Sequence, residues 1–294
     1  MFLQLAFNAL VSGLLLAMVA TGFSLIYNTT KVFHIAHGGY YVAAAYTFYS
    51  IYQLFGTHQS MRVIMATLIT FVVIAILAVL VELFVYRPVA RKQSEQGITL
   101  ISSMGVYLFI VNTIALMFGN GNIIIDSAFS DSIHLGSLIM APSQQLQLVT
   151  GLISLLMLVI FLKSKWFLSV RATMGNQQVA SVLGVNAGLI RMVSIISGSI
   201  LAGFSGVLML FDTGLDPQAG MSVTLSAAVA VIIGGSTSLE GTIIAALVIV
   251  ALQTLTGWWL SNEWKEAVTF AFLILVFFWR TEGIVSYKMR VEQQ

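Results

Sequence analysis

MRVIMATLITFVVIAILAVLVELFVY, residues 61–86, is an apolar stretch with no charged residue between Arg62 and Glu82. It is longer than the roughly 20 residues with which an α-helix crosses about 30 Å of hydrocarbon. Inside lipid every backbone N–H and C=O group must be paired within the protein, so such a stretch folds as a helix. The segment therefore predicts a membrane-spanning helix and sets the fold class of the chain.

The rest of the chain shares this apolar character. Of its 294 residues, 59% are hydrophobic and 8% are charged, and the mean hydropathy is +0.97. Soluble domains carry about 25% charged residues, so most of this surface must face lipid. Little sequence remains outside the apolar segments, which excludes a separate soluble catalytic domain. The absence of cysteine excludes disulfides, Fe–S clusters and zinc sites with cysteine ligands.

Nine apolar segments predict an all-α, polytopic transmembrane bundle. They lie near residues 3–27, 34–55, 61–86, 97–118, 145–162, 192–210, 221–233, 239–256 and 265–279. The first segment lacks a basic flank and is expected to be a retained span, not a signal peptide. Segment 221–233 is short for a full crossing and is expected to turn back or to pack inside the protein. We therefore expect eight or nine membrane segments, including re-entrant or broken helices.

The basic residues predict the orientation of the bundle. If the N-terminus is outside and all nine segments cross, eleven of the 13 Lys and Arg residues fall inside, and only Arg62 and Lys265 fall outside. Cytoplasmic loops carry such an excess of basic residues. The sequence thus predicts an external N-terminus and a cytoplasmic C-terminus, with residues 163–191 as the longest cytoplasmic connection.

A short amphipathic helix is expected within this connection, near residues 176–183. Its apolar stripe has helical spacing and consists of Val179, Val182, Leu183 and Val185. Gly184 and Asn186 are stop signals. The helix could rest on lipid headgroups or dock into the groove of a partner. The pattern alone favours the headgroups.

Glycine interrupts the apolar segments at two places, His37-Gly38-Gly39 and Gly234-Gly235-Ser236. In transporters, glycine-interrupted segments in both halves of the chain indicate the substrate path. Glycine also lets membrane helices pack closely, and we expect that role for Gly198, Gly203 and Gly206. For the two pairs, broken helices and close packing both remain open.

Polar residues inside the apolar segments are expected to face protein or a cavity, because facing lipid is costly. They are Asn8, Ser12, Thr21, Ser24, Asn112, Thr113 and Gln253. Any of them could meet a polar solute, although hydrogen bonding between helices is their commoner use. The residues that we place on a translocation path are His37, Gly38, Gly39, Asn8, Asn112, Gly234, Gly235 and Ser236.

The sequence predicts no catalytic or metal-binding residue. Glu82 lies close to Arg87, which indicates a boundary residue rather than a proton relay. His34 and His37 lack the further ligands of a metal site, so a structural role near the membrane boundary is expected. The GxxxxGK[ST] phosphate-binding motif is absent. ATP-driven transport would therefore need a separate nucleotide-binding subunit.

Four sequence elements, in this order, resemble the permease family of branched-chain amino acid ABC importers, which also includes urea and amide permeases. They are FHIAHG at 33–38, YRP at 86–88 with ISSMG at 101–105, the RA…SVLGVN segment at 171–186, and IGGSTSLEG at 233–241. The resemblance covers nearly the whole chain. It implies one permease domain over residues 1–294 in the bacterial inner membrane, with residues 163–191 as its cytoplasmic coupling loop.

The same resemblance implies that residues 176–186 form a coupling helix that docks onto an ATPase. The residues implied in coupling are Arg171, Val179, Ala180, Val182, Leu183, Gly184 and Asn186. The implied partners are a second, homologous permease, two ATP-binding cassette subunits and an extracytoplasmic solute-binding protein. ATP and Mg²⁺ would bind to those ATPases, so this chain would hold no cofactor and would not be an enzyme.

The implied activity is import of a small polar solute by alternating access, with branched-chain or other hydrophobic amino acids as the first candidates. A urea or amide permease is one alternative. A passive solute channel that needs no ATPase is another. An intramembrane enzyme is the third, although no pair of catalytic groups at mid-membrane depth supports it.

Overall fold

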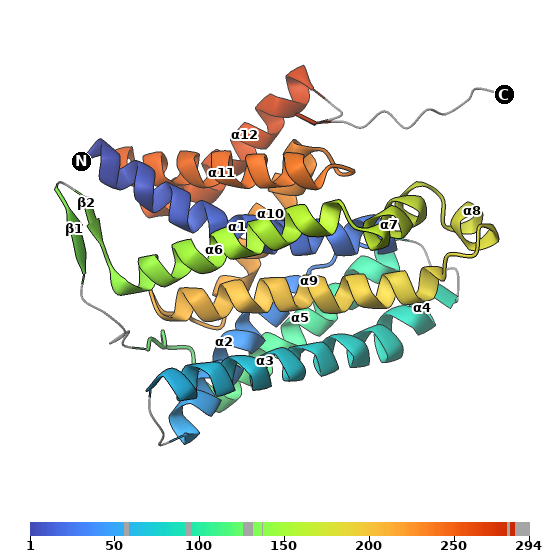
Figure 1. Cartoon of the computed structure of the whole chain (residues 1–294), viewed down its shortest axis with the longest axis horizontal. Helices are drawn as coiled ribbons and strands as arrows, with labels where there is room; N and C mark the ends of the chain where they lie inside the picture. Colours follow the sequence, from blue (N-terminus) through green and yellow to red (C-terminus); the bar gives the residue numbers. More distant parts are fainter. Residues whose placement is uncertain (56–58, 92–95, 126–131, 137, 281–282, 286–294) are drawn as a thin grey trace.

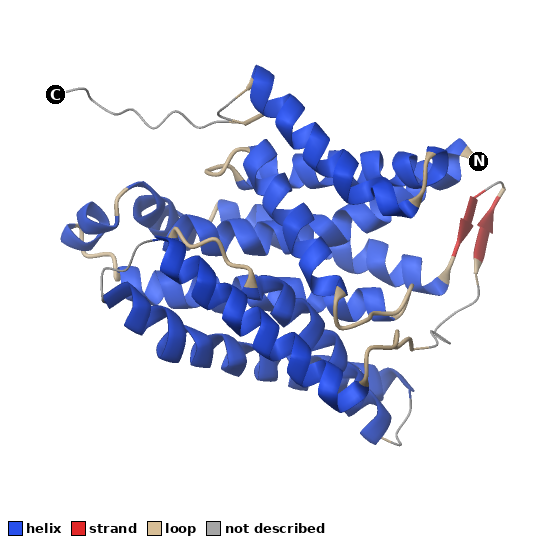
Figure 2. Ribbon diagram, turned by 180° about the vertical axis from the view of Figure 1, so that it is seen from behind, coloured by secondary structure: helices blue, strands red, loops and turns tan. Residues whose placement is uncertain are grey.

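The computed structural model describes residues 1–55, 59–91, 96–125, 132–136, 138–280 and 283–285. In this part of the chain the fold is a bundle of helices, most of which run along the long axis of the molecule (Figures 1 and 2). A two-stranded antiparallel hairpin, β1 (Ile133–Leu135) and β2 (Leu138–Met140), lies at one end. The all-α prediction is thus confirmed apart from this hairpin.

Each of the nine predicted segments contains a helix. They are α1 (Phe2–Thr30), α2 (Ala36–Leu54), α3 (Gln59–Val81), α5 (Gln96–Phe118), α6 (Pro142–Leu162), α9 (Ala187–Leu210), α10 (Ala219–Gly234), α11 (Leu239–Trp259) and α12 (Lys265–Trp279). Helix α3 continues through a π-helical turn, η1 (Glu82–Tyr86), into α4 (Arg87–Arg91). Six of these helices are long and apolar enough to cross a membrane, namely α1, α3 with η1 and α4, α5, α6, α9 and α11.

Helices α2, α10 and α12 have 19, 16 and 15 residues and are not among those six. The crossing of all nine segments stays a prediction. The expected short helix of the long connection is α8 (Gln177–Val182), and it is preceded by α7 (Lys165–Gly175), which the sequence did not indicate. A 3₁₀ turn, η2 (Asn262–Trp264), leads into α12.

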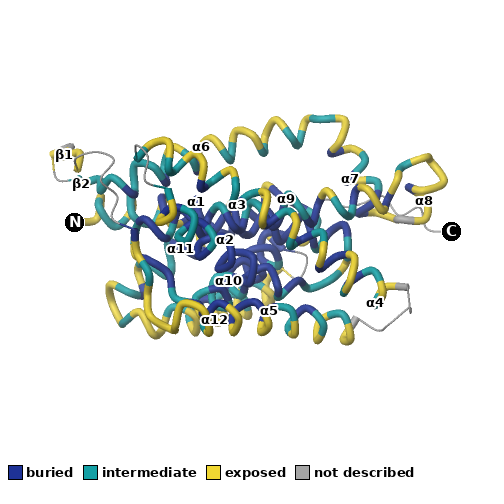
Figure 3. The backbone as a smooth tube through the Cα atoms, turned by 90° about the horizontal axis from the view of Figure 1, so that it is seen from below, coloured by how far each residue is buried: buried dark blue, intermediate teal, exposed yellow. Residues whose placement is uncertain are grey.

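Helix α1 lies at the centre of the bundle, packed between α6, α9, α10 and α11. It is apolar all round, and most of its residues beyond Leu10 are buried. A helix of this pattern belongs in an interior. Helices α3, α5 and α6 instead expose many large apolar side chains, and Figure 3 shows exposed stretches along them around a buried centre. Such an apolar exterior is expected where lipid is the solvent.

Helices α2 and α10 begin in the middle of the bundle. The His37 ring, in the first turn of α2, is hydrogen-bonded through Nε2 to the carbonyl oxygen of Val19 at 3.0 Å, well inside α1. Residues 31–35 therefore turn back along α1 before α2 starts. The first turn of α10 packs against that of α2, with Gly220 against Gly38. His37 thus lies deeper than the boundary position expected from the sequence.

Glycines provide the closest helix contacts. A Cβ atom added to Gly22 of α1 or Gly198 of α9 would lie 2.6 Å from the carbonyl oxygen of the other residue. Real Cβ atoms essentially never approach another atom within 3.0 Å. Gly203 and Gly206 of α9 meet α2 in the same way, at the Ala44 methyl and the Tyr41 backbone. The packing role predicted for these α9 glycines is confirmed.

We expect Gly198→Leu to destabilise the bundle, because its side chain would collide with the backbone of α1. The cost should be about 1–3 kcal/mol, as for other overpacked interiors. Thermal unfolding of the purified chain in detergent measures it. The matched control is Gly105→Leu, since a Cβ at Gly105 meets nothing within 4 Å. Equal midpoint temperatures of unfolding for the two variants would contradict this account of the α1–α9 contact.

Candidate functional site

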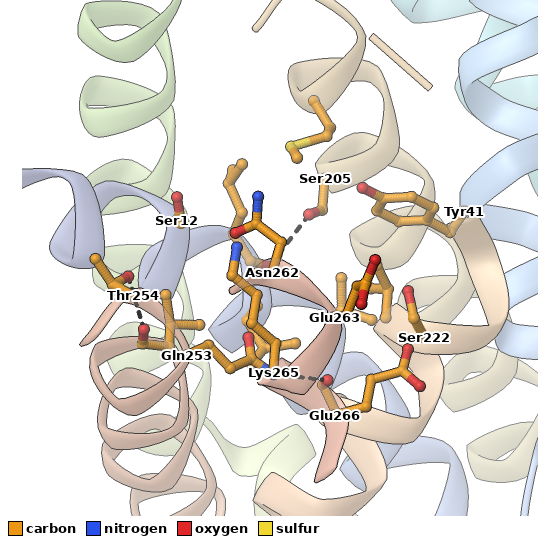
Figure 4. Close-up of a pocket in the computed structure, with 17 residues that line it drawn as sticks. Ser12, Tyr41, Ser205, Ser222, Gln253, Thr254, Asn262, Glu263, Lys265 and Glu266 are labelled. Carbon is orange, nitrogen blue, oxygen red and sulfur yellow. Dashed lines mark hydrogen bonds between the residues drawn. The ribbon is translucent and has the colours of Figure 1, made fainter. Parts of the chain in front are cut away.

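A cavity of about 460 Å³ lies between α1, α2, α9, α10, α11 and the start of α12 (Figure 4). We call it the vestibule. One part of its wall is polar and carries Ser12, Ser205, Ser222, Ser226, Gln253 and Thr254. Another part is aliphatic and carries Leu15, Leu16, Val19, Val223 and Val250. The hydroxyl group of Tyr41, a buried side chain of α2, points toward the same space.

Charged side chains of both signs line the vestibule where η2 joins α12. They are Glu263, Lys265 and Glu266, next to Asn262. Deeper in the wall, the Gln253 amide donates to Ser226 Oγ at 3.2 Å and to Thr269 Oγ1 at 2.9 Å. These two bonds join α10, α11 and α12. The vestibule can therefore offer both charges and apolar surface to a solute, and a hydrogen-bonded amide stiffens its wall.

A second cavity, of about 500 Å³, lies near the opposite end of α1. We call it the inner cavity. Its wall includes Tyr27 and Thr30 of α1, Lys31 and Phe33 of the following connection, Tyr86 of η1 and Arg191 of α9. Lys31 and Arg191 make this wall cationic. The two cavities thus lie along α1, at opposite sides of the turn where α2 begins.

The glycine pairs predicted on the path are packing contacts and do not line either cavity. A Cβ at Gly38 would collide with Gly220, and one at Gly234 would collide with Gly241. Gly39 lies against Ile110. Gly235 has φ +98°, a conformation that favours glycine, and ends α10. Their role on the path stays a prediction, and the structure gives them a part in positioning the helices around it.

The other predicted path residues are spread over the bundle. The Ser236 carbonyl oxygen accepts a hydrogen bond from the Asn28 amide. Asn8 accepts hydrogen bonds from Gln4 and Gln144 near the start of α1. Asn112 is exposed and donates to a carbonyl oxygen of its own helix at 2.7 Å. Two further polar residues singled out from the sequence, Ser12 and Gln253, do line the vestibule.

A buried ion pair was missed in the sequence analysis. Arg191 of α9 donates through Nε to Glu82 Oε1 at 2.8 Å and through a terminal nitrogen to Oε2 at 3.3 Å. Arg87, the expected neighbour of Glu82, lies farther away at 3.8 Å. The Glu82 side chain is 1% exposed, so the protein shields it from solvent, and its position at the membrane boundary stays a prediction. Two features of the sequence could have indicated this pair. They are an acidic residue near the end of one apolar helix and an arginine at the start of another.

The predicted coupling residues divide into an exposed group and a structural group. Val179, Val182 and Leu183 are exposed on α8 and its end, and we call these three the coupling surface. Ala180 is buried. Asn186 caps α9 by accepting from the Leu189 N–H at 3.0 Å, and Gly184 turns the chain with φ +83°. The Arg171 guanidinium lies over the Phe167 ring at 5.8 Å. Their part in coupling stays a prediction.

Nothing in the described residues suggests a metal centre, because no group of three or more His, Asp or Glu side chains comes together there. His34 and His37 instead pack against aromatic rings and make hydrogen bonds through one nitrogen each. In the described part of the chain these two histidines therefore serve in packing and hydrogen bonding.

Comparison with known proteins gives one family over most of the chain. The family described as "Branched-chain amino acid transport system / permease component" matches residues 5–277. The high-affinity branched-chain amino acid transport system permease protein LivH of Salmonella typhimurium is 28% identical over 97% of this chain and 96% of its own length. The protein of that name in Escherichia coli has the same identity and coverage. BraD of Pseudomonas aeruginosa, a permease of the same description, is 23% identical.

A solved structure shares the fold. The chain resembles a chain of PsaBC from Streptococcus pneumoniae in complex with Fab, with a TM-score of 0.52 and 13% identity. The similarity covers 94% of this chain and 91% of the other. At this identity the likeness bears on the fold alone, and it shows that the helices follow an arrangement already seen in another protein.

We expect a cysteine placed at Ser222 in the vestibule to react readily with a water-soluble thiol reagent. The chain has no cysteine of its own, so one substitution gives one reactive site. Ala230→Cys is the matched control on the same helix, because Ala230 is fully buried. Labelling rates in intact cells should differ by at least about tenfold, because reaction needs access to the thiol. Equal rates would contradict a water-filled vestibule.

Proposed function

The chain belongs to the branched-chain amino acid transport system permease family, and on that premise we propose that it moves branched-chain amino acids through the membrane. It is a multi-pass protein of the bacterial cytoplasmic membrane and a transport protein rather than an enzyme. The observation that carries the proposal of substrate is the vestibule. Its lining combines charged groups of both signs with several aliphatic side chains.

A zwitterionic amino acid with an aliphatic side chain fits this lining. Glu263 and Glu266 suit an α-ammonium group, and Lys265 suits an α-carboxylate. Leu15, Val19 and Val250 offer apolar surface to the side chain. Urea and simple amides have neither a net-charged group nor an aliphatic branch, so this wall would be poorly matched to them. The vestibule thus favours amino acids within the family's range.

The orientation that we propose places the N-terminus outside and the C-terminus in the cytoplasm, with all of residues 1–294 in one permease domain. Eleven of the 13 basic residues support it through the positive-inside rule. In Figure 1 the N-terminus and the β hairpin lie at one end of the bundle, and α7 and α8 lie toward the other. The vestibule would then open outward, and residues 163–191 would form the cytoplasmic coupling loop.

The energy for transport would come from other chains. The transporter would have two ATP-binding cassette subunits, which bind ATP and Mg²⁺, and we place one of them against the coupling surface. A second, homologous permease would complete the membrane part, and an extracytoplasmic binding protein would deliver the solute. The coupling surface supports such docking, because its three apolar side chains are exposed and their contact with water is unfavourable. A shift of the permease from a mostly outward-facing to a mostly inward-facing population takes a difference of about 5.5 kcal/mol in the free energy of binding to the two states.

Deleting this chain from its host should lower uptake of labelled leucine at least about tenfold, because the path itself is lost. Excess isoleucine and valine should compete with leucine in the parent strain, whereas urea and acetamide should not. Competition by urea or acetamide would instead indicate an amide permease. Leucine uptake that continues without the ATPase subunits would indicate a passive channel.

We expect Leu183→Asp to weaken docking of the ATPase, because it places a charge in an apolar contact. The loss should reach at least about tenfold in affinity, or about 1.4 kcal/mol. Co-purification from mild detergent measures it. Gln178→Asp is the matched control, since it adds the same charge to an exposed polar position of α8. Normal co-purification of the ATPase with Leu183→Asp would show that this surface rests on lipid headgroups.

A further inference from the structure

Five aromatic and imidazole rings lie between the vestibule and the inner cavity. We call Phe23, Phe33, His34, His37 and Tyr86 the ring cluster. Ring centroids are 5.2 Å apart for Phe23 and Phe33, 5.7 Å for Phe23 and His37, 6.1 Å for His34 and His37, and 5.2 Å for His34 and Tyr86. Phe33 and Tyr86 line the inner cavity, whereas His37 is bonded to the backbone of Val19, which lines the vestibule.

The ring cluster is held by hydrogen bonds from several elements. His34 Nδ1 is hydrogen-bonded to the Tyr86 hydroxyl group at 2.9 Å. That hydroxyl group also donates to Ser103 Oγ of α5 at 3.1 Å. Ser103 Oγ in turn accepts from the N–H of Ala36, the first residue of α2, at 3.0 Å. The position of Tyr86 therefore sets the position of the connection that carries His34 and begins α2.

Tyr86 belongs to the same π-helical turn as Glu82. The turn η1 spans Glu82–Tyr86, so its first residue holds the ion pair and its last residue holds His34. Short π-helical segments inside α-helices are frequent at functional sites. A shift of the Glu82 carboxylate would therefore move the backbone that carries the Tyr86 ring.

The partner of Glu82 sits close to the coupling surface. Arg191 lies near the start of α9, whose N-cap is Asn186, four residues after the end of α8. It donates one hydrogen bond to each carboxylate oxygen of Glu82, whose side chain is 1% exposed. A paired charge so deeply buried resists separation, because an unpaired partner would be left without solvent. A displacement of α8 and α9 would thus be transmitted to Glu82.

We propose that the ring cluster is the inner gate of the path and that the Arg191–Glu82 ion pair transmits movement of the coupling surface to it. Arg191 and Glu82 are then positioning residues, because their role in this proposal is to move the ring cluster, and Arg191 also forms part of the inner cavity wall. This inference rests on the proposed function. If this series of contacts carries the coupling, the effects of mutations at its two ends depend on one another. Mutation of both ends, singly and together, measures that dependence.

The test uses the assembled transporter with its binding protein in vesicles, and measures leucine moved per ATP hydrolysed. We expect Arg191→Met to lower this ratio about tenfold while ATPase activity and co-purification of the subunits change little. A merely structural role would lower both activities together. Arg87→Met is the matched control, because Arg87 faces the same carboxylate at 3.8 Å from a more exposed position. It should leave the ratio unchanged.

The two ends of the contact chain should give the same defect. Tyr86→Phe keeps the ring and removes the hydroxyl group that holds His34. We expect it to lower the ratio as Arg191→Met does, and we expect the double variant to be no worse than either single variant. Additive losses would overturn the proposal. If Arg191→Met fails to accumulate in the membrane, Tyr86→Phe decides alone, and an unchanged ratio would overturn the proposal.

Transport by the parent complex tests the proposed function, and the ratio measured with Arg191→Met tests the coupling role. If the parent complex does not transport leucine, the proposed function fails. If the parent transports leucine and Arg191→Met does so with an unchanged ratio, only the coupling role fails. Labelling of the Ser222→Cys variant gives a second readout. ATP should change its labelling rate in the parent background and leave it unchanged with Arg191→Met, and an equal response in both would overturn the proposal.

Discussion

Backbone groups that are shielded from water must be paired inside the protein, and the two helices that begin in mid-bundle depend on this constraint. At the start of α2, the Ala36 N–H donates to a serine of α5, and the N–H groups of His37 and Gly38 donate to carbonyl oxygens just before the helix. At the start of α10, Asp216 accepts from the N–H groups of Gln218 and Ala219. These bonds give the first N–H groups of both helices partners within the protein.

The starts of α2 and α10 also locate the cavities. Gly38 and Gly220 bring the two first turns into close contact. Tyr41 and Ser222, about one turn further along each helix, already face the vestibule. On the other side, the connection after α1 leaves room for the inner cavity. The two cavities are therefore separated by the packed starts of α2 and α10.

The Glu82–Arg191 pair has a different physical character from the surrounding contacts. A buried ion pair is costly to break, because an unpaired buried charge lacks the solvent that would stabilise it. The pair lies between the start of α9 and the ring cluster.

The sequence was sufficient for the helical fold, because long apolar stretches have one stable solution in lipid. Each of the nine apolar segments that it indicated contains a helix, and the α9 glycines were correctly interpreted as packing. It identified the short helix α8 through its apolar stripe, and it indicated the family through four motifs. Of the vestibule wall it suggested Ser12 and Gln253, since polar residues in apolar segments need a partner or a cavity.

The depth of α2, the vestibule and the Glu82–Arg191 pair were decided only by the tertiary structure. His37 looked like a boundary residue because apolar length does not show that a connection turns back along its own helix. Glu82 looked like a partner of Arg87 because that residue is near in sequence, while Arg191 is 109 residues away. Which side chains face a cavity depends on how helices rotate against one another, and hydropathy alone does not encode that rotation.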